Sequence, residues 1–267
     1  MIVFEERNHT YTNQITKELY TSVTTLINEY IPEFDSQYWS LYKAIKDVLE
    51  NYNQFKMYKL AVGGWEKVVP AWRSQPMIKY QEQVESKQQD YLIQWDLISE
   101  TACGIGTAEH KRRELESCNT DYYEYNDTLY ETPTKHSQND ILRAQDFTSN
   151  RVYTELLVHN DRYKVAGQVD WVLKKGRNIW IKDYKTSKEI TKTAFRDRTL
   201  DAPLNDLPDA NFYHYALQMS TYGWMMEQCG YHVKKLEIIH TRTEEAIKMP
   251  YLKDHVELMM TDHVNLI

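Results

Sequence analysis

Two carboxylates and a lysine lie on two neighbouring apolar segments of this sequence. In NIWIKDYKTS, residues 178–187, side chains alternate across a strand, so Asp183 and Lys185 follow two isoleucines on one face. The preceding segment carries Asp170, thirteen positions before Asp183, and a Gly-Arg-Asn turn separates the two segments. We therefore expect a hairpin that brings the carboxylates of Asp170 and Asp183 close together.

These three side chains have the chemistry of a metal site. Two carboxylates at close range repel one another, and a divalent cation relieves that repulsion. Because the donors are hard oxygens, Mg²⁺ or Mn²⁺ is favoured over zinc. Lys185 would steer an attacking water and stabilise charge on a phosphate oxygen. The alternative is a surface salt bridge between Asp183 and Lys185 at an exposed strand end.

Four further polar residues lie where they would complete such a site. Glu155 interrupts the apolar segment VYTELLV; it is either a carboxylate at the metal or an outward-facing strand residue. His110 follows a glycine-rich break, where an imidazole would complete a metal shell or simply pack or face solvent. Gln218 and Tyr222 are four residues apart and share a helix face, with ordinary packing as the alternative.

The charge of the chain limits the class of protein. The 267 residues carry a net charge of −7, which argues against a protein that coats nucleic acid through bulk positive charge. Residues 174–198, however, hold nine basic and three acidic side chains, a net charge of +6, around Asp183 and Lys185. That overlap favours contact with phosphate over a merely solvated face.

Other whole classes are excluded by what the sequence lacks. No segment reaches the roughly 18 apolar residues of a membrane helix, and the N-terminus lacks the layout of a signal peptide. We therefore expect an intracellular protein, in a cell's cytoplasm or that of a phage-infected host, without membrane partners. The three scattered cysteines form no disulfide or CxxC pattern and are expected to be buried free thiols. No nucleotide-binding phosphate loop occurs, so we expect no bound nucleotide and no helicase activity.

The pattern of the chain predicts an α/β (α+β) fold, with a mixed central sheet flanked by helices and a helical N-terminal region. We expect residues 1–103 to form that helical region, which would guide DNA, and residues 104–267 to form the core. Between them, the CGIGT sequence at 103–107 is expected to interrupt a long helix. The remaining expectations are a loop at 119–137, helices at about 138–147, 210–228 and from 253, and strands at about 151–159, 163–175, 178–187 and 232–242.

In order and spacing these motifs resemble the RecB-type branch of the PD-(D/E)XK nuclease superfamily. The resemblance covers roughly residues 104–240. It implies a restriction-endonuclease-like core. The matching segments are GTAEH (Gly106–His110), TELLV (Thr154–Val158), GQVDWV (Gly167–Val172), IKDYKTSK (Ile181–Lys188) and QMSTY (Gln218–Tyr222).

The resemblance also implies roles for individual residues. His110, Asp170 and Asp183, with the backbone carbonyl of Tyr184, would bind one or two Mg²⁺ or Mn²⁺ ions, and Lys185 would be the catalytic lysine. Some members of this branch hold an iron–sulfur cluster on four cysteines; this chain has three, so we expect none. Glu155 is a looser match to an acidic position of the first core strand. Gln218 and Tyr222 would brace the site and contact DNA. Thr186 and Lys188 would also contact DNA.

The segment TSVTTLI (Thr21–Ile27) resembles a motif of mitochondrial genome maintenance exonucleases and their phage relatives, which act on single-stranded DNA. A helix that opens there would present free N–H groups and the hydroxyls of Ser22 and Thr24 to a phosphate. Further aromatic residues of the N-terminal part either stack on unpaired bases or form a core. These are Trp65, Trp72, Tyr80 and Tyr91.

Together these features predict a metal-dependent deoxyribonuclease, most simply an exonuclease on single-stranded DNA or DNA ends. Such an enzyme would serve DNA repair, recombination or phage DNA metabolism, with any helicase or recombination protein supplied separately. Alternatives from other classes are a non-catalytic protein that binds nucleic-acid ends on a nuclease scaffold, a structure-specific endonuclease, and an RNA-processing protein. The first of these is disfavoured because every charged position of the site is filled.

Overall fold

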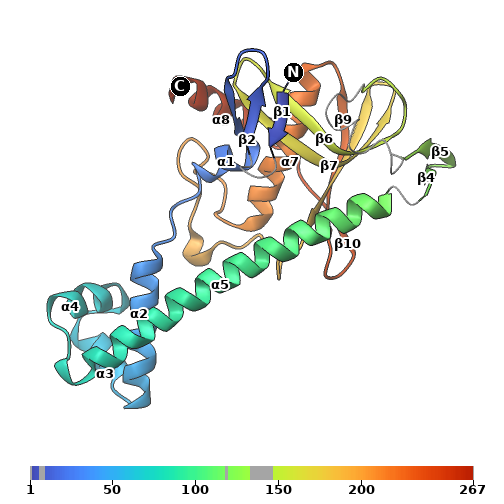
Figure 1. The fold of residues 1–267 in the computed structure, drawn as a ribbon. Helices are drawn as coiled ribbons and strands as arrows, with labels where there is room; N and C mark the ends of the chain where they lie inside the picture. Colours follow the sequence, from blue (N-terminus) through green and yellow to red (C-terminus); the bar gives the residue numbers. More distant parts are fainter. Residues whose placement is uncertain (1, 6–9, 118–119, 133–146, 267) are drawn as a thin grey trace. The chain divides into compact units, whose positions relative to one another are not determined.

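The computed structural model describes residues 2–5, 10–117, 120–132 and 147–266, and the chain forms two compact units (Figure 1). Unit 1 comprises Met1–Pro32 and Ile105–Ile267, and unit 2 comprises Glu33–Gly104. The boundary at residue 104 falls inside one helix, α5 (Ile78–Ser117). The first 32 residues, expected to belong to the helical region, are instead part of unit 1.

Unit 1 is built on a mixed sheet, as the alternation of apolar segments predicts. It has eight strands in the order β1-β2-β3-β7-β8-β9-β10, and β6 pairs with β7 outside this path. The β3–β7 and β8–β9 pairs are parallel and the others are antiparallel. The strands are β1 (Ile2–Glu5), β2 (Thr10–Asn13), β3 (Leu19–Ser22), β6 (Val152–Asn160), β7 (Val165–Lys175), β8 (Asn178–Lys185), β9 (His232–His240) and β10 (Glu245–Lys248).

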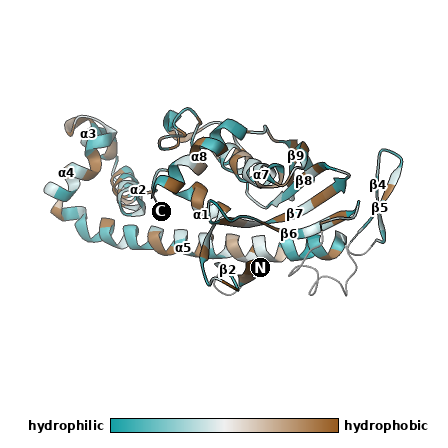
Figure 2. Ribbon diagram, turned by 90° about the horizontal axis from the view of Figure 1, so that it is seen from above, coloured by the Kyte–Doolittle hydropathy of each residue, from teal (hydrophilic) through white to brown (hydrophobic). Residues whose placement is uncertain are grey.

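Strand β7 is the centre of this sheet; nine of its eleven residues are buried, and it carries both hydrophobic and hydrophilic residues (Figure 2). Along one edge it pairs with β6. Its end pairs with β8 through Trp171–Lys175, and its start pairs with β3 through Val165 and Ala166. Neither β3 nor β8 pairs with residues 167–170 between these two stretches. This gap contains the glycine and the aspartate of the GQVD motif.

Helix α7 (Asn211–Gln228) packs against strands of the sheet and buries most of its residues. It also contacts α1 (Val23–Asn28) and α8 (Lys253–Leu266). Its apolar side chains join those of β6 to β9 in the main core of unit 1. The helix ends before Gly230, whose φ of 85° is the left-handed conformation that glycine adopts at helix ends.

A two-stranded hairpin, β4 (Tyr122–Tyr125) and β5 (Thr128–Glu131), packs its aromatic side chains on β7 and β8. The ring centroids of Tyr123 and Trp171 lie 5.0 Å apart. A loop was expected here from the sequence, and that expectation was wrong. Asn126 and Asp127 both have positive φ, which is the turn that joins two strands by two residues.

Unit 2 is helical and has its own core. Trp72, Tyr80 and Tyr91 are buried in it, so for these three aromatics the core interpretation is confirmed. Trp65 is half-buried and stacks on Trp39 at 6.1 Å between centroids. The elements are α2 (Ser36–Asn51), α3 (Phe55–Ala61), the 3-10 turn η1 (Trp65–Lys67), α4 (Val68–Ser74) and the first part of α5.

Three further expectations were wrong. Helix α5 is not interrupted at the CGIGT sequence, because a helix tolerates isolated glycines at a cost of about 1 kcal/mol each. Residues 2–22 contain three short strands rather than helices. Cys103 and Cys229 are exposed rather than buried. The helix expected at 138–147 lies, up to residue 146, outside the described residues.

Candidate metal centre and active site

The hairpin of β7 and β8 is regular up to one position and then stops. The last pair is Trp171 with Lys182, and the next position in the same register holds Asp170 and Asp183. Instead of a backbone partner, the N–H of Tyr184 donates to Oδ2 of Asp170 over 2.8 Å. The expected proximity of the two aspartates therefore follows from the register, and it coincides with the end of the ladder.

On the other edge of β7 the ladder is interrupted at the same place. The pairs on either side put Glu155 of β6 opposite Asp170, but these two residues do not pair. Glu155 has a φ of 49°, a left-handed conformation that costs a non-glycine residue about 1–3 kcal/mol. Such strain persists only where surrounding structure enforces it, and it marks Glu155 as more than an ordinary strand residue.

His110, from the last turns of α5, completes a convergent group with Glu155 and Asp170. One donor atom from each of these three residues lies within 4.8 Å of the others. Nδ1 of His110 is 3.3 Å from Oδ1 of Asp170. Two carboxylates and an imidazole at this range could hold a metal ion. Asp183, assigned to the metal from the sequence, lies beside this group and is paired with Lys185.

The electrostatics of the group are those of crowded, buried charges. Burial, with the charge of Asp170, raises the pKa of Glu155 to about 8. Burial likewise raises the pKa of Asp183 to about 6, although the charge of Lys185 opposes it. For His110, burial lowers the pKa, but the hydrogen bond and charge of Asp170 prevail and raise it to about 9. In the metal-free protein, protons bound to these side chains therefore neutralise part of the negative charge that a metal ion would otherwise neutralise.

Lys185 is held from two sides, as a positioned cation would be. Its Nζ lies 2.8 Å from Oδ2 of Asp183, which is 1% exposed, and donates to Oε1 of Gln218 over 3.0 Å. Nε2 of Gln218 in turn donates to the hydroxyl of Tyr222 over 3.0 Å. Burial lowers the pKa of Lys185, but the charges of Asp183 and Asp170 raise it above its ordinary value, so the lysine is charged.

This arrangement rules out the exposed surface salt bridge considered from the sequence, because the side chain of Asp183 is buried and that of Lys185 is only 16% exposed. It also supports the expected bracing role of Gln218 and Tyr222. Tyr222 is 3% exposed, so its ring is packed inside the protein rather than presented to a ligand.

Of the two motif glycines Gly106 and Gly167, only Gly167 has a steric reason. A Cβ on Gly167 would lie 2.6 Å from Cε1 of Tyr222, so the ring of Tyr222 requires a glycine there. A Cβ on Gly106 would lie 3.8 Å from Oγ1 of Thr186, an ordinary contact. Helix α5 therefore passes close to the residue that follows Lys185.

Of the other residues expected to contact DNA, one already accepts a backbone hydrogen bond and three are exposed or half-buried. Ser22 caps helix α1, and its hydroxyl accepts the N–H of Thr25 over 3.0 Å, so the Ser22 oxygen already has an intramolecular role. Thr24 and Lys188 are exposed and Thr186 is half-buried. Thr186 and Lys188 follow Lys185 directly and therefore remain at the site.

The basic segment 174–198 does not form one surface. Lys174 and Lys182 are packed within unit 1: Lys174 donates to the carbonyl of Thr148, and Lys182 lies over the ring of Trp171 at 4.2 Å. Lys174 lies in β7 opposite Ile179, six residues before Lys185 along β8, which is roughly 20 Å at about 3.3 Å per strand residue. The prediction that the basic segment 174–198 contacts phosphate is therefore kept only for the middle of the segment, around Lys185 and Lys188.

Sequence reasoning missed two residues at the site. Tyr215, one turn before Gln218 on α7, has its ring 4.9 Å from the ammonium of Lys185, and its helical spacing was a usable signal. Arg242 donates through Nε to the carbonyl of Thr186 over 2.9 Å. No sequence signal identifies it, because β9 and β8 become neighbours only in the folded sheet.

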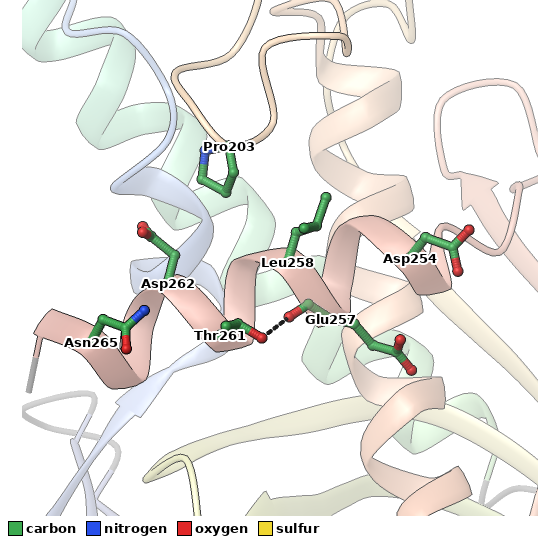
Figure 3. A pocket seen from close by; sticks show the side chains of 7 residues that line it. All are labelled: Pro203, Asp254, Glu257, Leu258, Thr261, Asp262 and Asn265. Carbon is green, nitrogen blue, oxygen red and sulfur yellow. Dashed lines mark hydrogen bonds between the residues drawn. The ribbon is translucent and has the colours of Figure 1, made fainter.

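A hollow of about 540 Å³ lies along α8, away from these residues (Figure 3). The side chains that line it include Asp254, Glu257 and Asp262, and its one internal hydrogen bond runs from Thr261 to the carbonyl of Glu257. Three carboxylates would repel a phosphate backbone. This hollow is therefore not a candidate for binding DNA.

Two comparisons of the chain with known proteins found no similar family or protein. A scan against protein-family models finds no match to the chain, and a search of curated proteins finds none. Among the described residues, no helix combines the length and apolar character needed to cross a membrane.

Proposed function

We propose that the chain is a metal-dependent deoxyribonuclease that hydrolyses phosphodiester bonds of single-stranded DNA or DNA ends. The observation that carries the proposal is the shared interruption at Asp170. There, the β7–β8 ladder ends, the β6–β7 ladder is interrupted, three side chains that could bind a metal converge, and Lys185, 16% exposed, is paired with the adjacent carboxylate of Asp183. A structural sheet would not keep four ionisable groups at such a cost.

The donor set fits Mn²⁺ or Mg²⁺. Asp170 and Glu155 offer carboxylate oxygens and His110 offers a ring nitrogen. The carboxylate of Asp183 interacts electrostatically with Asp170 and His110, and the resemblance implies the backbone carbonyl of Tyr184 as a further ligand. Carboxylates and a carbonyl are the ligands of these hard cations, and the imidazole makes Mn²⁺ the better fit. When bound, the cation would activate water and neutralise charge on the phosphate.

The chain's own residues would then orient the reaction. An ammonium has three N–H donors; Lys185 forms an ion pair with Asp183 and donates one N–H to Gln218, so at least one donor is left for a substrate oxygen. Asp183 and Gln218 fix where that donor points, and Tyr222 fixes Gln218. Lys185 would thus stabilise the charge that grows on the phosphate oxygens. Water adds to phosphorus and the 3′-oxygen leaves, giving the 5′-phosphate product that the resemblance implies.

The test is a product ladder. Oligonucleotides labelled at either end, single- and double-stranded, are incubated with the intact chain and increasing Mn²⁺. The proposal predicts stepwise, metal-dependent shortening of the single strand, and loss of cleavage in Asp183→Asn with the fold unchanged. Binding without cleavage at any metal concentration would favour the end-binding protein instead. Internal cuts would indicate an endonuclease, and faster cleavage of a matched RNA would contradict the DNA assignment.

A further inference from the structure

The segment that follows Lys185 is fixed by the turn between β9 and β10. The N–H of Thr241 donates to the carbonyl of Lys185 over 3.0 Å, and Nε of Arg242 donates to that of Thr186 over 2.9 Å. A ring nitrogen of His240 lies 2.7 Å from the carbonyl of Ser187. Three consecutive carbonyls are therefore held, so the side chains of this segment have a set position relative to Lys185.

Arg242 differs from the other arginines near the site. Arg113 pairs with Glu109 and Glu244, and Arg112 pairs with Glu109 and Glu116. Arg242 is exposed, and among the described residues no acidic side chain pairs with it. A guanidinium has five N–H donors, and the bond to Thr186 uses one. Four donors of a pre-oriented cation thus remain free for an incoming ligand.

We propose that Arg242 binds a backbone phosphate of the nucleic-acid substrate, next to the phosphate that lies at Lys185. This rests on the proposed function and deepens it, because a second phosphate contact selects a polyanionic chain over a small phosphate ester. The guanidinium fork matches two phosphate oxygens, and its Nε bond to Thr186 reduces the freedom lost on binding. Lys188 is exposed and without an ion pair among the described residues, and it adds to the same positive rim.

The experiment compares two arginines in the intact chain. Arg242→Gln removes the contact, and Arg177→Gln makes the same change at an exposed arginine. Arg177 precedes the other end of β8, roughly 25 Å from Lys185 at about 3.3 Å per strand residue. Binding of a fluorescein-labelled oligothymidylate is measured with Ca²⁺ in place of Mn²⁺, over a series of salt concentrations. Thermal melting confirms that both variants are folded.

We expect Arg242→Gln to weaken binding by about 5- to 10-fold at low salt. It should also lower the slope of log affinity against log salt by about 0.7, the value for one phosphate contact on a single strand. Arg177→Gln should match the wild type. Arg242→Lys should keep the slope but bind more weakly than wild type, since lysine has no Nε to orient it.

Equal affinities and slopes for Arg242→Gln and Arg177→Gln would overturn the assignment of Arg242, even in a chain that cleaves DNA. Weaker binding by Arg242→Gln than by Arg177→Gln can also be told apart from the nuclease function itself. If binding depends on Arg242 but the wild type cleaves nothing with Mn²⁺, the nuclease function fails and the phosphate site stands.

Discussion

Each end of the β7–β8 hairpin holds a lysine that is mostly covered, Lys174 at 5% and the side chain of Lys185 at 16% exposure, but by different means. At the turn end the ladder is regular, and Lys174 donates to the carbonyl of Thr148 and lies over the rings of Phe147 and Tyr231. At the open end the ladder stops, and Lys185 is held by Asp183 and Gln218. A buried lysine is therefore no sign of catalysis by itself. What indicates catalysis is a lysine that is held in place by groups that are themselves costly to bury.

The largest expected difference between the two ends is catalytic. Lys185→Met should reduce the rate of DNA cleavage by about 10²–10³-fold or more, because it removes a positioned cation from the developing charge. Lys174→Met, with the same chemical change at the turn end, should keep the rate within about threefold. Rates are measured with excess Mn²⁺ below the melting temperature of either variant. Equal losses in both variants would remove the distinction between the ends.

The metal site should depend on the strained residue of the open end. Glu155→Asn keeps a side chain that tolerates the left-handed conformation but removes the carboxylate. We expect Mn²⁺ affinity to fall by about 10- to 100-fold, and the metal-free protein to become more stable because a buried acid is lost. Calorimetric titration and thermal melting measure the two effects. Unchanged Mn²⁺ affinity would exclude Glu155 as a ligand.

The open end should also make stability depend on pH. The pKa of Glu155 rises from 4.5 to about 8 on folding, so the folded state retains a proton that the unfolded chain loses. Its contribution to stability is present below pH 4.5 and is lost as the pH rises through 8. The raised pKa of His110 has the same sign, with its contribution lost between 6.5 and about 9. Melting temperatures of the metal-free protein should thus fall between pH 6 and 9.

Mn²⁺ should reverse this trend, because it replaces protons on the same side chains and binds better as they dissociate. Glu155→Gln, which carries no titrating proton, should flatten the pH dependence. A metal-free protein that becomes more stable over this range would contradict the raised pKa values of Glu155 and His110.

The smallest expected effect concerns the bracing of Lys185. Tyr222→Phe removes the hydroxyl that fixes Gln218, at a cost of about 1 kcal/mol, equivalent to about a fivefold lower turnover. The Michaelis constant should not change, because Tyr222 is buried and does not reach the substrate. A change in that constant alone would indicate instead that Tyr222 contacts DNA.

Much of this site was predictable from local patterns. Alternation along β8 placed Asp183 and Lys185 on the face of two isoleucines, and helical spacing placed Gln218 beside Tyr222. The strained backbone of Glu155 had no signature in the sequence, because it lies at an interruption of the β6–β7 ladder that exists only in the folded sheet. Two features depend on neighbours distant in sequence and were missed: the strands β1 to β3, and Arg242. The hairpin of β4 and β5 was missed although its turn at Asn126 and Asp127 is local.

The N-terminal strands show why pattern alone fails there. Each of β1 to β3 has four residues, too few for a clear period of two. Strand β3 is joined to the core through Thr21 and Ser22, whose partners Val165 and Ala166 lie more than a hundred residues away. Within α5, the glycines suggested a break, but a long helix tolerates their cost.

If DNA is hydrolysed at a metal bound where the ladders of β7 are interrupted, Asp170, Glu155 and His110 must bind the same cation. Anomalous diffraction at the manganese absorption edge tests this directly, from crystals of Lys185→Met with Mn²⁺ and a single-stranded oligonucleotide. We expect a manganese peak in contact with Asp170, Glu155 and His110, and a phosphate of the oligonucleotide beside it. A protein with no manganese at Asp170, or with its phosphates bound elsewhere, would contradict this expectation.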